Sequence, residues 1–152
     1  MKTLVIFYSR TGNTRLVGKA IAKLLKADVE EIIDTRNRSG FFGYIRSGYE
    51  SVSKKHIVIK DTKFDSSKYD LVIIGTPIWA GVSSPVRTYL SKNKNFKKVA
   101  FFCTMGGSGD KKTFSQMESL SKTPILTLSL REKELKNNVY QKKIKTFVDK
   151  LN

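Results

Sequence analysis

The stretch Thr3-Leu4-Val5-Ile6-Phe7-Tyr8-Ser9-Arg10-Thr11-Gly12-Asn13-Thr14 decides the fold of this chain. Residues 3–8 are almost wholly apolar and rich in β-branched and aromatic side chains, which predicts a strand buried on both faces. Residues 9–14 form a short polar turn. After the turn, apolar residues recur at helical spacing, at Leu16, Val17, Ala20, Ile21, Leu24 and Leu25. The stretch is therefore predicted to join a buried strand to an amphipathic helix.

The composition of the turn is typical of an anion site. It carries the hydroxyls of Ser9, Thr11 and Thr14 together with Gly12 and Asn13. The first N–H groups of a helix lack partners within the helix, and the helix dipole favours an anion beside them. The turn lacks the lysine of a triphosphate loop and the three glycines of a dinucleotide turn, so it favours one terminal phosphate monoester. The simpler alternative is a hydroxyl-rich helix cap without a ligand.

Length and composition favour one domain, residues 1–152, with a proper hydrophobic core. No apolar run approaches the length of a membrane span, and a strand begins too early to leave room for a signal peptide. The single cysteine, Cys103, excludes an internal disulfide, and one cysteine with one histidine disfavours a zinc site. We expect a soluble cytoplasmic protein.

Strand and helix patterns alternate along the whole chain, which predicts a parallel sheet with helices on both faces. Further strands are predicted at residues 28–33, 69–76, 99–104 and 124–130. The acidic residues of 28–33 alternate with apolar ones, as expected of an edge strand. Helices are predicted from Pro85 to Leu90, through Phe114, Met117 and Leu120, and over 139–151.

An unusually aromatic segment, residues 39–55, also has helical spacing. The first interpretation is a helix that covers the sheet with its aromatic face. The alternative places it beside a ligand, where Arg36, Arg38, Tyr44 or Tyr49 shapes access. His56 follows, and we interpret it as structural.

Two more polar loops follow predicted central strands. Because ligands of open α/β sheets bind beyond the carboxyl ends of the strands, all three loops are expected to meet at one site. The second loop contains Thr76, Pro77, Ile78, Trp79, Ala80 and Gly81, and the third contains Thr104, Met105, Gly106, Gly107, Gly109 and Asp110. With Ser9, Arg10, Thr11, Gly12, Asn13 and Thr14, these are the predicted binding residues. No catalytic or metal-ligating residue is predicted.

The pattern of residues 9–14 after a first strand resembles the phosphate loop of flavodoxins, and residues 76–81 resemble their flavin-ring loop. Flavodoxins are themselves a standard example of the switch-point rule, with FMN at that point. The resemblance implies a three-layer, doubly wound α/β fold with a five-stranded parallel sheet of order 2-1-3-4-5, and noncovalently bound FMN. It implies that Trp79 stacks on the flavin; the alternative is a tryptophan that fills a hydrophobic gap. Residues 105–109 would donate backbone N–H groups to the ring, or alternatively form only a flexible turn.

The charge of the chain departs from the acidic habit of flavodoxins. Lys and Arg number 29 against 13 Asp and Glu, which gives a net charge of +16. A solvated basic surface is the simplest interpretation, and attraction of acidic redox partners is the functional one. Nucleic-acid binding is disfavoured because the lysines are spread over several predicted surfaces instead of one aromatic-lined face.

Two redox functions remain open from the sequence, beside a third hypothesis, a scaffold or nucleic-acid protein that uses the fold without flavin. The first is a flavodoxin-type carrier that shuttles electrons between a reductase and acceptor enzymes. The second is an FMN-dependent NAD(P)H reductase of quinone- or nitro-type substrates, favoured by the absence of an aromatic side chain in the third loop. The oligomeric state is left open.

Overall fold

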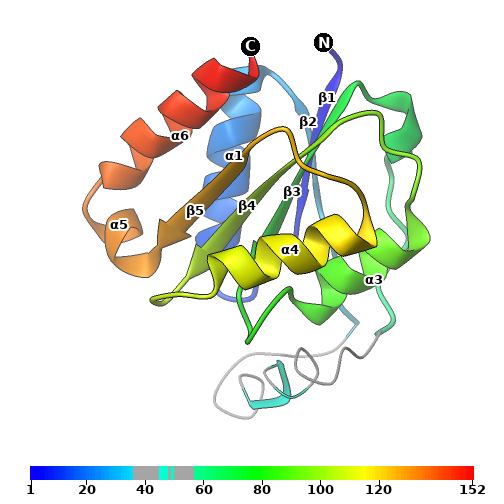
Figure 1. The fold of residues 1–152 in the computed structure, drawn as a ribbon, viewed down its shortest axis with the longest axis horizontal. Helices are drawn as coiled ribbons and strands as arrows, with labels where there is room; N and C mark the ends of the chain where they lie inside the picture. The colour runs from blue at the N-terminus through cyan, green and yellow to red at the C-terminus, as the bar shows by residue number, and fades with distance from the viewer. Residues whose placement is uncertain (36–44, 48, 50–56) are drawn as a thin grey trace.

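The computed structural model describes residues 1–35, 45–47, 49 and 57–152. Within these residues, five parallel strands form one sheet in the order β2-β1-β3-β4-β5 (Figure 1). The strands are β1 (Thr3–Phe7), β2 (Asp28–Glu31), β3 (Leu71–Pro77), β4 (Val99–Met105) and β5 (Thr127–Arg131). The predicted parallel sheet and its strand order are confirmed.

Helices cover both faces of the sheet. On one face lie α1 (Asn13–Leu25) and α6 (Val139–Leu151), and on the other lie α3 (Ser84–Lys92) and α4 (Asp110–Leu120) (Figure 1). Two further short elements are the 3₁₀ turn η1 (Ser66–Lys68) and the helix α5 (Glu132–Lys136). The three-layer arrangement predicted from the alternating pattern is therefore confirmed.

The core consists of two apolar layers, one on each side of the sheet. Alternate residues of β1 serve each layer: Leu4 and Ile6 pack in the layer with α3 and α4, while Val5 and Phe7 pack with α1 and α6. Strand β3 carries a glycine at position 75 because the ring of Phe102 lies where a Cβ would be. A central strand without a side chain at this point lets the neighbouring aromatic ring lie against its backbone.

Several predicted boundaries differ from the observed ones. The second strand ends at Glu31, before the predicted end at residue 33, and the fifth begins at Thr127 instead of 124. The ladder to β4 starts with the pair Phe101 and Thr127, so the residues before it are connection. Helix α1 begins three residues before its first predicted apolar position, and α5 was not predicted.

Most of the aromatic segment 39–55 lies outside the described residues, as do Arg36, Arg38, Tyr44 and His56. Of its described residues, 45–47 and 49 are helical, and the side chains of Ile45 and Tyr49 are exposed. The two interpretations of this segment therefore stay predictions. Among the described residues, no helix combines the length and apolar character needed to cross a membrane.

Candidate functional site

Three loops meet at the carboxyl end of the sheet and enclose a cleft of about 290 Å³. They follow β1, β3 and β4, which lie side by side in the sheet. The cleft is lined by Arg10, Thr11, Asn13, Thr14, Pro77, Ile78, Trp79, Thr104, Met105, Gly106 and Glu132. The structure therefore brings together residues from all three predicted loops.

The first loop presents an open helix N-terminus to this cleft. Gly12 is the N-cap of α1 with a φ of 106°, a left-handed conformation that suits glycine, and its carbonyl accepts from the Leu16 N–H at 2.9 Å. Within the part of the chain that the structure describes, no side chain caps the start of this helix. The Ser9 hydroxyl accepts from the Gly12 N–H at 3.1 Å, one residue before the helix. First-turn N–H groups without side-chain caps form a ready anion site.

Only some of the predicted hydroxyls of this loop are available to a ligand. Thr11 is exposed, whereas Ser9 and Thr14 are buried. Ser9 is engaged with Gly12, and the Thr14 hydroxyl lies 2.8 Å from that of Thr104. The accessible hydroxyl of the loop is therefore that of Thr11.

The second loop is a tight turn that reverses the chain after β3. Ile78 and Val82 form an isolated antiparallel bridge, and Ala80 and Gly81 have positive φ values of 68° and 140°. The Trp79 N–H donates to the Gly81 carbonyl at 3.0 Å. From α4, the Gln116 side chain accepts from the Val82 N–H at 3.0 Å, which ties the turn to the helix beside it.

A second set of hydrogen bonds fixes the base of this turn. The buried Thr76 hydroxyl accepts from the Ser83 N–H at 3.1 Å and lies 2.9 Å from the Ser83 hydroxyl. The Ile78 N–H donates to the Thr104 carbonyl at 3.0 Å, which connects the second loop to the end of β4. The turn is therefore held from both sides.

The Trp79 side chain lines the cleft and also packs in the core. It is 6% exposed, and its ring meets the Tyr8 ring edge-on, with centroids 5.4 Å apart and planes at 88°. The contact with Tyr8 agrees with the interpretation that Trp79 fills a hydrophobic gap. Its position on the cleft wall is also the position that stacking on a bound flavin would require. Stacking of Trp79 on a flavin stays a prediction.

The third loop leaves its side of the cleft open. A Cβ added to Gly106 or Gly107 would meet no atom within 4 Å. Gly109, with a φ of 106°, is the N-cap of α4, and its carbonyl accepts from the Thr113 N–H at 3.0 Å. Gly107 and Asp110 line a neighbouring depression together with Met105, which also lines the cleft.

The remaining predicted residues lie behind the cleft or beside it. Ser9, Gly12, Thr76, Ala80, Gly81 and Gly109 shape the loops without lining the cleft. Sequence reasoning missed Glu132, which opens α5 and lines the cleft as its one carboxylate among the described residues. No motif marked it, because its place depends on where β5 ends.

Cys103, in β4, takes no part in the site. The thiol is fully buried, and burial raises its pKa to about 12. A thiol with that pKa stays neutral near pH 7 and is a poor nucleophile. Its interpretation as a packing residue agrees with this environment.

Comparison with known proteins places this geometry in a family. Structurally similar proteins include a flavoprotein from Lactobacillus acidophilus NCFM solved in complex with FMN, with a TM-score of 0.74, 23% identity, and coverage of 89% of this chain and 96% of that one. A flavoprotein from Bacteroides eggerthii DSM 20697 has a TM-score of 0.76, 23% identity, and coverage of 97% and 96%. Oxidised flavodoxin 2 from Bacillus cereus has a TM-score of 0.59, 15% identity, and coverage of 97% and 95%.

The TM-scores establish the shared fold, and the match to a family profile establishes the family. No curated protein sequence matches this chain. The sequence profile of the flavodoxin family matches residues 2–151, nearly the whole chain. The chain therefore belongs to the flavodoxin family.

Proposed function

We propose that the chain binds FMN noncovalently in the cleft and acts as a flavodoxin-type electron carrier between a reductase and acceptor enzymes. The observation that carries this proposal is the N-terminus of α1, which no side chain of the described residues caps and which opens into a cleft built from three strand-end loops. Membership of the flavodoxin family, and the FMN bound to the Lactobacillus acidophilus protein, support the choice of ligand.

The residues present fit a phosphate at one end of the cleft and a flat ring at the other. The Thr11 hydroxyl and the first N–H groups of α1 would hold the phosphate, because both offer donors and neither is used by a side chain of the described residues. Trp79 and the backbone of Met105 and Gly106 would border the ring system. When bound, FMN supplies the electron-transfer chemistry, and the protein orients it and sets its potential.

The net charge of the chain affects both the reduction potential of bound FMN and the choice of redox partner. A net charge of +16 stabilises the negative charge of a reduced flavin. We therefore expect this protein with reduced FMN to be a weaker reductant than an acidic flavodoxin. The same charge favours acidic redox partners, because opposite net charges accelerate encounter.

One observation favours a second candidate, an FMN-dependent NAD(P)H reductase of quinone- or nitro-type substrates. The cleft wall at Gly106 is free of side chains, and the adjacent Gly107 is equally open. An open wall of this kind leaves room for a substrate or nicotinamide beside the ring. NAD(P)H added alone separates the two candidates: rapid loss of flavin absorbance supports the reductase, and no loss supports the carrier.

The binding proposal is tested by titration of the apoprotein with FMN and with riboflavin, followed by flavin and Trp79 fluorescence. We expect one-to-one mutual quenching with FMN. Thr11→Ala should weaken FMN binding roughly tenfold or more, the value of a hydrogen bond to a charged group, and leave riboflavin binding nearly unchanged. Thr123→Ala, an exposed threonine beyond α4, is the matched control. Absence of quenching at high FMN would overturn the binding proposal, and equal losses for both ligands would refute the phosphate assignment.

A further inference from the structure

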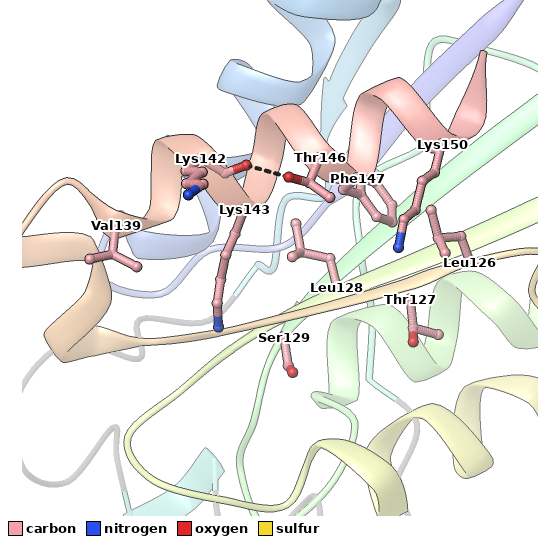
Figure 2. Close-up of a pocket in the computed structure, with 10 residues that line it drawn as sticks. All are labelled: Leu126, Thr127, Leu128, Ser129, Val139, Lys142, Lys143, Thr146, Phe147 and Lys150. Atoms are coloured by element: carbon pink, nitrogen blue, oxygen red, sulfur yellow. Dashed lines mark hydrogen bonds between the residues drawn. The ribbon is translucent and has the colours of Figure 1, made fainter.

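A second hollow, of about 410 Å³, lies between β5 and α6, the last strand and last helix of the chain. Figure 2 shows Leu128 and Phe147 between the strand and the helix, with Lys143 and Lys150 extending from α6 toward β5. Thr127 and Ser129 lie on the opposite side of the strand (Figure 2). The hollow therefore has an apolar base, a strand along one side and a row of lysines above it.

The strand that borders this hollow, called the groove from here on, is an edge strand of the sheet. Among the described residues, β5 pairs with β4 alone, with Phe101 opposite Thr127 and Cys103 opposite Ser129. The Leu126 carbonyl accepts from the Phe101 N–H at 3.1 Å, so the backbone groups of Leu126 and Leu128 point toward β4. Because alternate residues of a strand point their N–H and C=O groups to opposite edges, those of Thr127 and Ser129 point outward. This edge can accept a further strand.

The lysines of α6 are only partly neutralised. Lys143 pairs with Glu134 at 2.6 Å, and Lys145 pairs with Asp149 at 2.8 Å. Lys142 and Lys150, both exposed and both lining the groove, have no ion-pair partner within the part of the chain that the structure describes. An occupant of the groove would therefore meet uncompensated positive charge.

The opposite edge of the sheet is arranged differently. The carboxylates of β2 are all engaged within the chain: Asp28 accepts from the Tyr69 hydroxyl at 2.7 Å, Glu30 accepts from the Phe64 N–H at 3.1 Å, and Glu31 pairs with Arg15 at 2.7 Å. The acidic strand of a second copy is thus not available to the basic edge, and two copies at +16 repel each other. The occupant that fits is a different protein.

We propose that the groove between β5 and α6 docks an acidic, extended segment of a partner protein, which adds a strand to the free edge of β5. Backbone hydrogen bonds to Thr127 and Ser129 supply affinity, and carboxylates of the segment face Lys142 and Lys150. A nucleic acid fits less well, because no exposed aromatic side chain lines the groove for base stacking.

The groove leads toward the flavodoxin cleft. Ser129 and Lys143 line both the groove and the depression that includes Met105, and Met105 also lines the cleft. A segment docked along β5 therefore approaches the loop after β4. The docking itself requires no cofactor, so it goes beyond the proposed function, and its test is independent of FMN binding.

The test uses the full chain and a capped, fluorescently labelled peptide of eight residues in which Glu alternates with Val and Thr. We expect binding by fluorescence anisotropy at low salt, weakened as salt rises. The Lys142→Gln/Lys150→Gln variant should lose roughly 5- to 30-fold in affinity, as expected for two exposed ion pairs. Lys145→Gln, in the same helix but already paired with Asp149, is the matched control and should change affinity less than about twofold.

Two measurements separate strand addition from loose electrostatic contact. Amide hydrogen exchange of Thr127 and Ser129 should slow when the peptide binds. A peptide N-methylated at its central residues, with the same charge, should bind at least roughly tenfold more weakly because it cannot form the ladder. If the lysines of α6 beside this edge instead prevent strand pairing, the acidic peptide should not bind. No binding of the acidic peptide, equal binding of the N-methylated peptide, or tighter binding of a single-stranded oligothymidylate would overturn the proposal.

Discussion

The hydroxyl oxygens of Thr14 and Thr104 lie 2.8 Å apart, although 90 positions separate the two residues in the sequence. Thr14 lies in the first turn of α1, and Thr104 is the last residue but one of β4. Both side chains are buried, so each hydroxyl serves as the hydrogen-bond partner that water would otherwise supply to the other. The pair joins the first loop to the end of β4 in the protein without a ligand.

Replacing both members of this pair should therefore cost less than the sum of the two single replacements. Thr14→Val leaves the Thr104 hydroxyl buried without a partner, and we expect a loss of about 1–3 kcal/mol in the free energy of unfolding. The double variant Thr14→Val/Thr104→Val should lose less than the sum of the single variants. Urea unfolding of the apoprotein measures all three. Thr11→Val, at an exposed position, is the control, and additive losses would contradict a direct interaction.

Gly81 and Gly106 should respond differently to the same substitution. Gly81 has a φ of 140°, and an added Cβ would lie 2.5 Å from the Gln116 side-chain oxygen, whereas one at Gly106 meets nothing within 4 Å. Gly81→Ala should lower the unfolding free energy by about 1–3 kcal/mol through backbone strain and displacement of Gln116. Gly106→Ala should stay within about 0.5 kcal/mol. Thermal unfolding of both apoproteins tests this, and equal melting temperatures would show that the turn is not constrained as described.

The environment of Tyr69 predicts that the folded protein loses stability at alkaline pH. Burial first, and then its hydrogen bond to Asp28, raises the Tyr69 pKa from 10.0 to about 12. The folded state therefore holds this proton more tightly than the unfolded state, and the resulting stabilisation is complete below pH 10 and is lost as the pH rises to about 12. Tyr69→Phe should lower the unfolding free energy at pH 8 by about 1–2 kcal/mol and make the decline above pH 10 shallower.

Urea unfolding at several pH values between 8 and 11.5 measures this decline. A residual decline is expected in the variant, because burial also raises the pKa values of Tyr89 and Cys103 to about 12. Tyr140→Phe, half-buried and without a hydrogen bond to the described residues, should change the unfolding free energy at pH 8 by less than about 0.5 kcal/mol. An unchanged alkaline slope in Tyr69→Phe would exclude Tyr69 as a source of the pH dependence.

Local patterns predicted the fold and the position of the cleft. Residues 3–14 carry strand, turn and helix signals in one continuous stretch, and the strand-end rule brings three loops together whatever their exact boundaries. The sequence pattern could not show that Trp79 packs edge-on against Tyr8, or that the Thr14 hydroxyl is hydrogen-bonded to that of Thr104. Both contacts depend on packing between segments that are distant in the sequence. Glu132 was missed for the same reason. Its place on the cleft wall follows from the end of β5 at Arg131, one residue beyond the predicted strand.

Arg87 is expected to destabilise the fold that contains it. The residue lies in α3 and is only 4% exposed, and its Nε and one terminal nitrogen, Nη2, form no hydrogen bond with the described residues. Burial lowers the pKa of its guanidinium, which nevertheless stays protonated at any physiological pH. Replacing a buried charge by an apolar side chain of similar length commonly stabilises a protein by about 1–4 kcal/mol.

Arg87→Met should therefore raise the unfolding free energy of the apoprotein by about 1–3 kcal/mol, measured by urea unfolding at pH 7. Arg15→Met is the matched control. The Arg15 guanidinium donates two hydrogen bonds to Glu31, at 2.7 and 2.8 Å, and its side chain is 43% exposed. Its removal should cost no more than about 1 kcal/mol, because exposed ion pairs contribute little. A loss of stability in Arg87→Met would instead show that its guanidinium has an anionic partner outside the described residues.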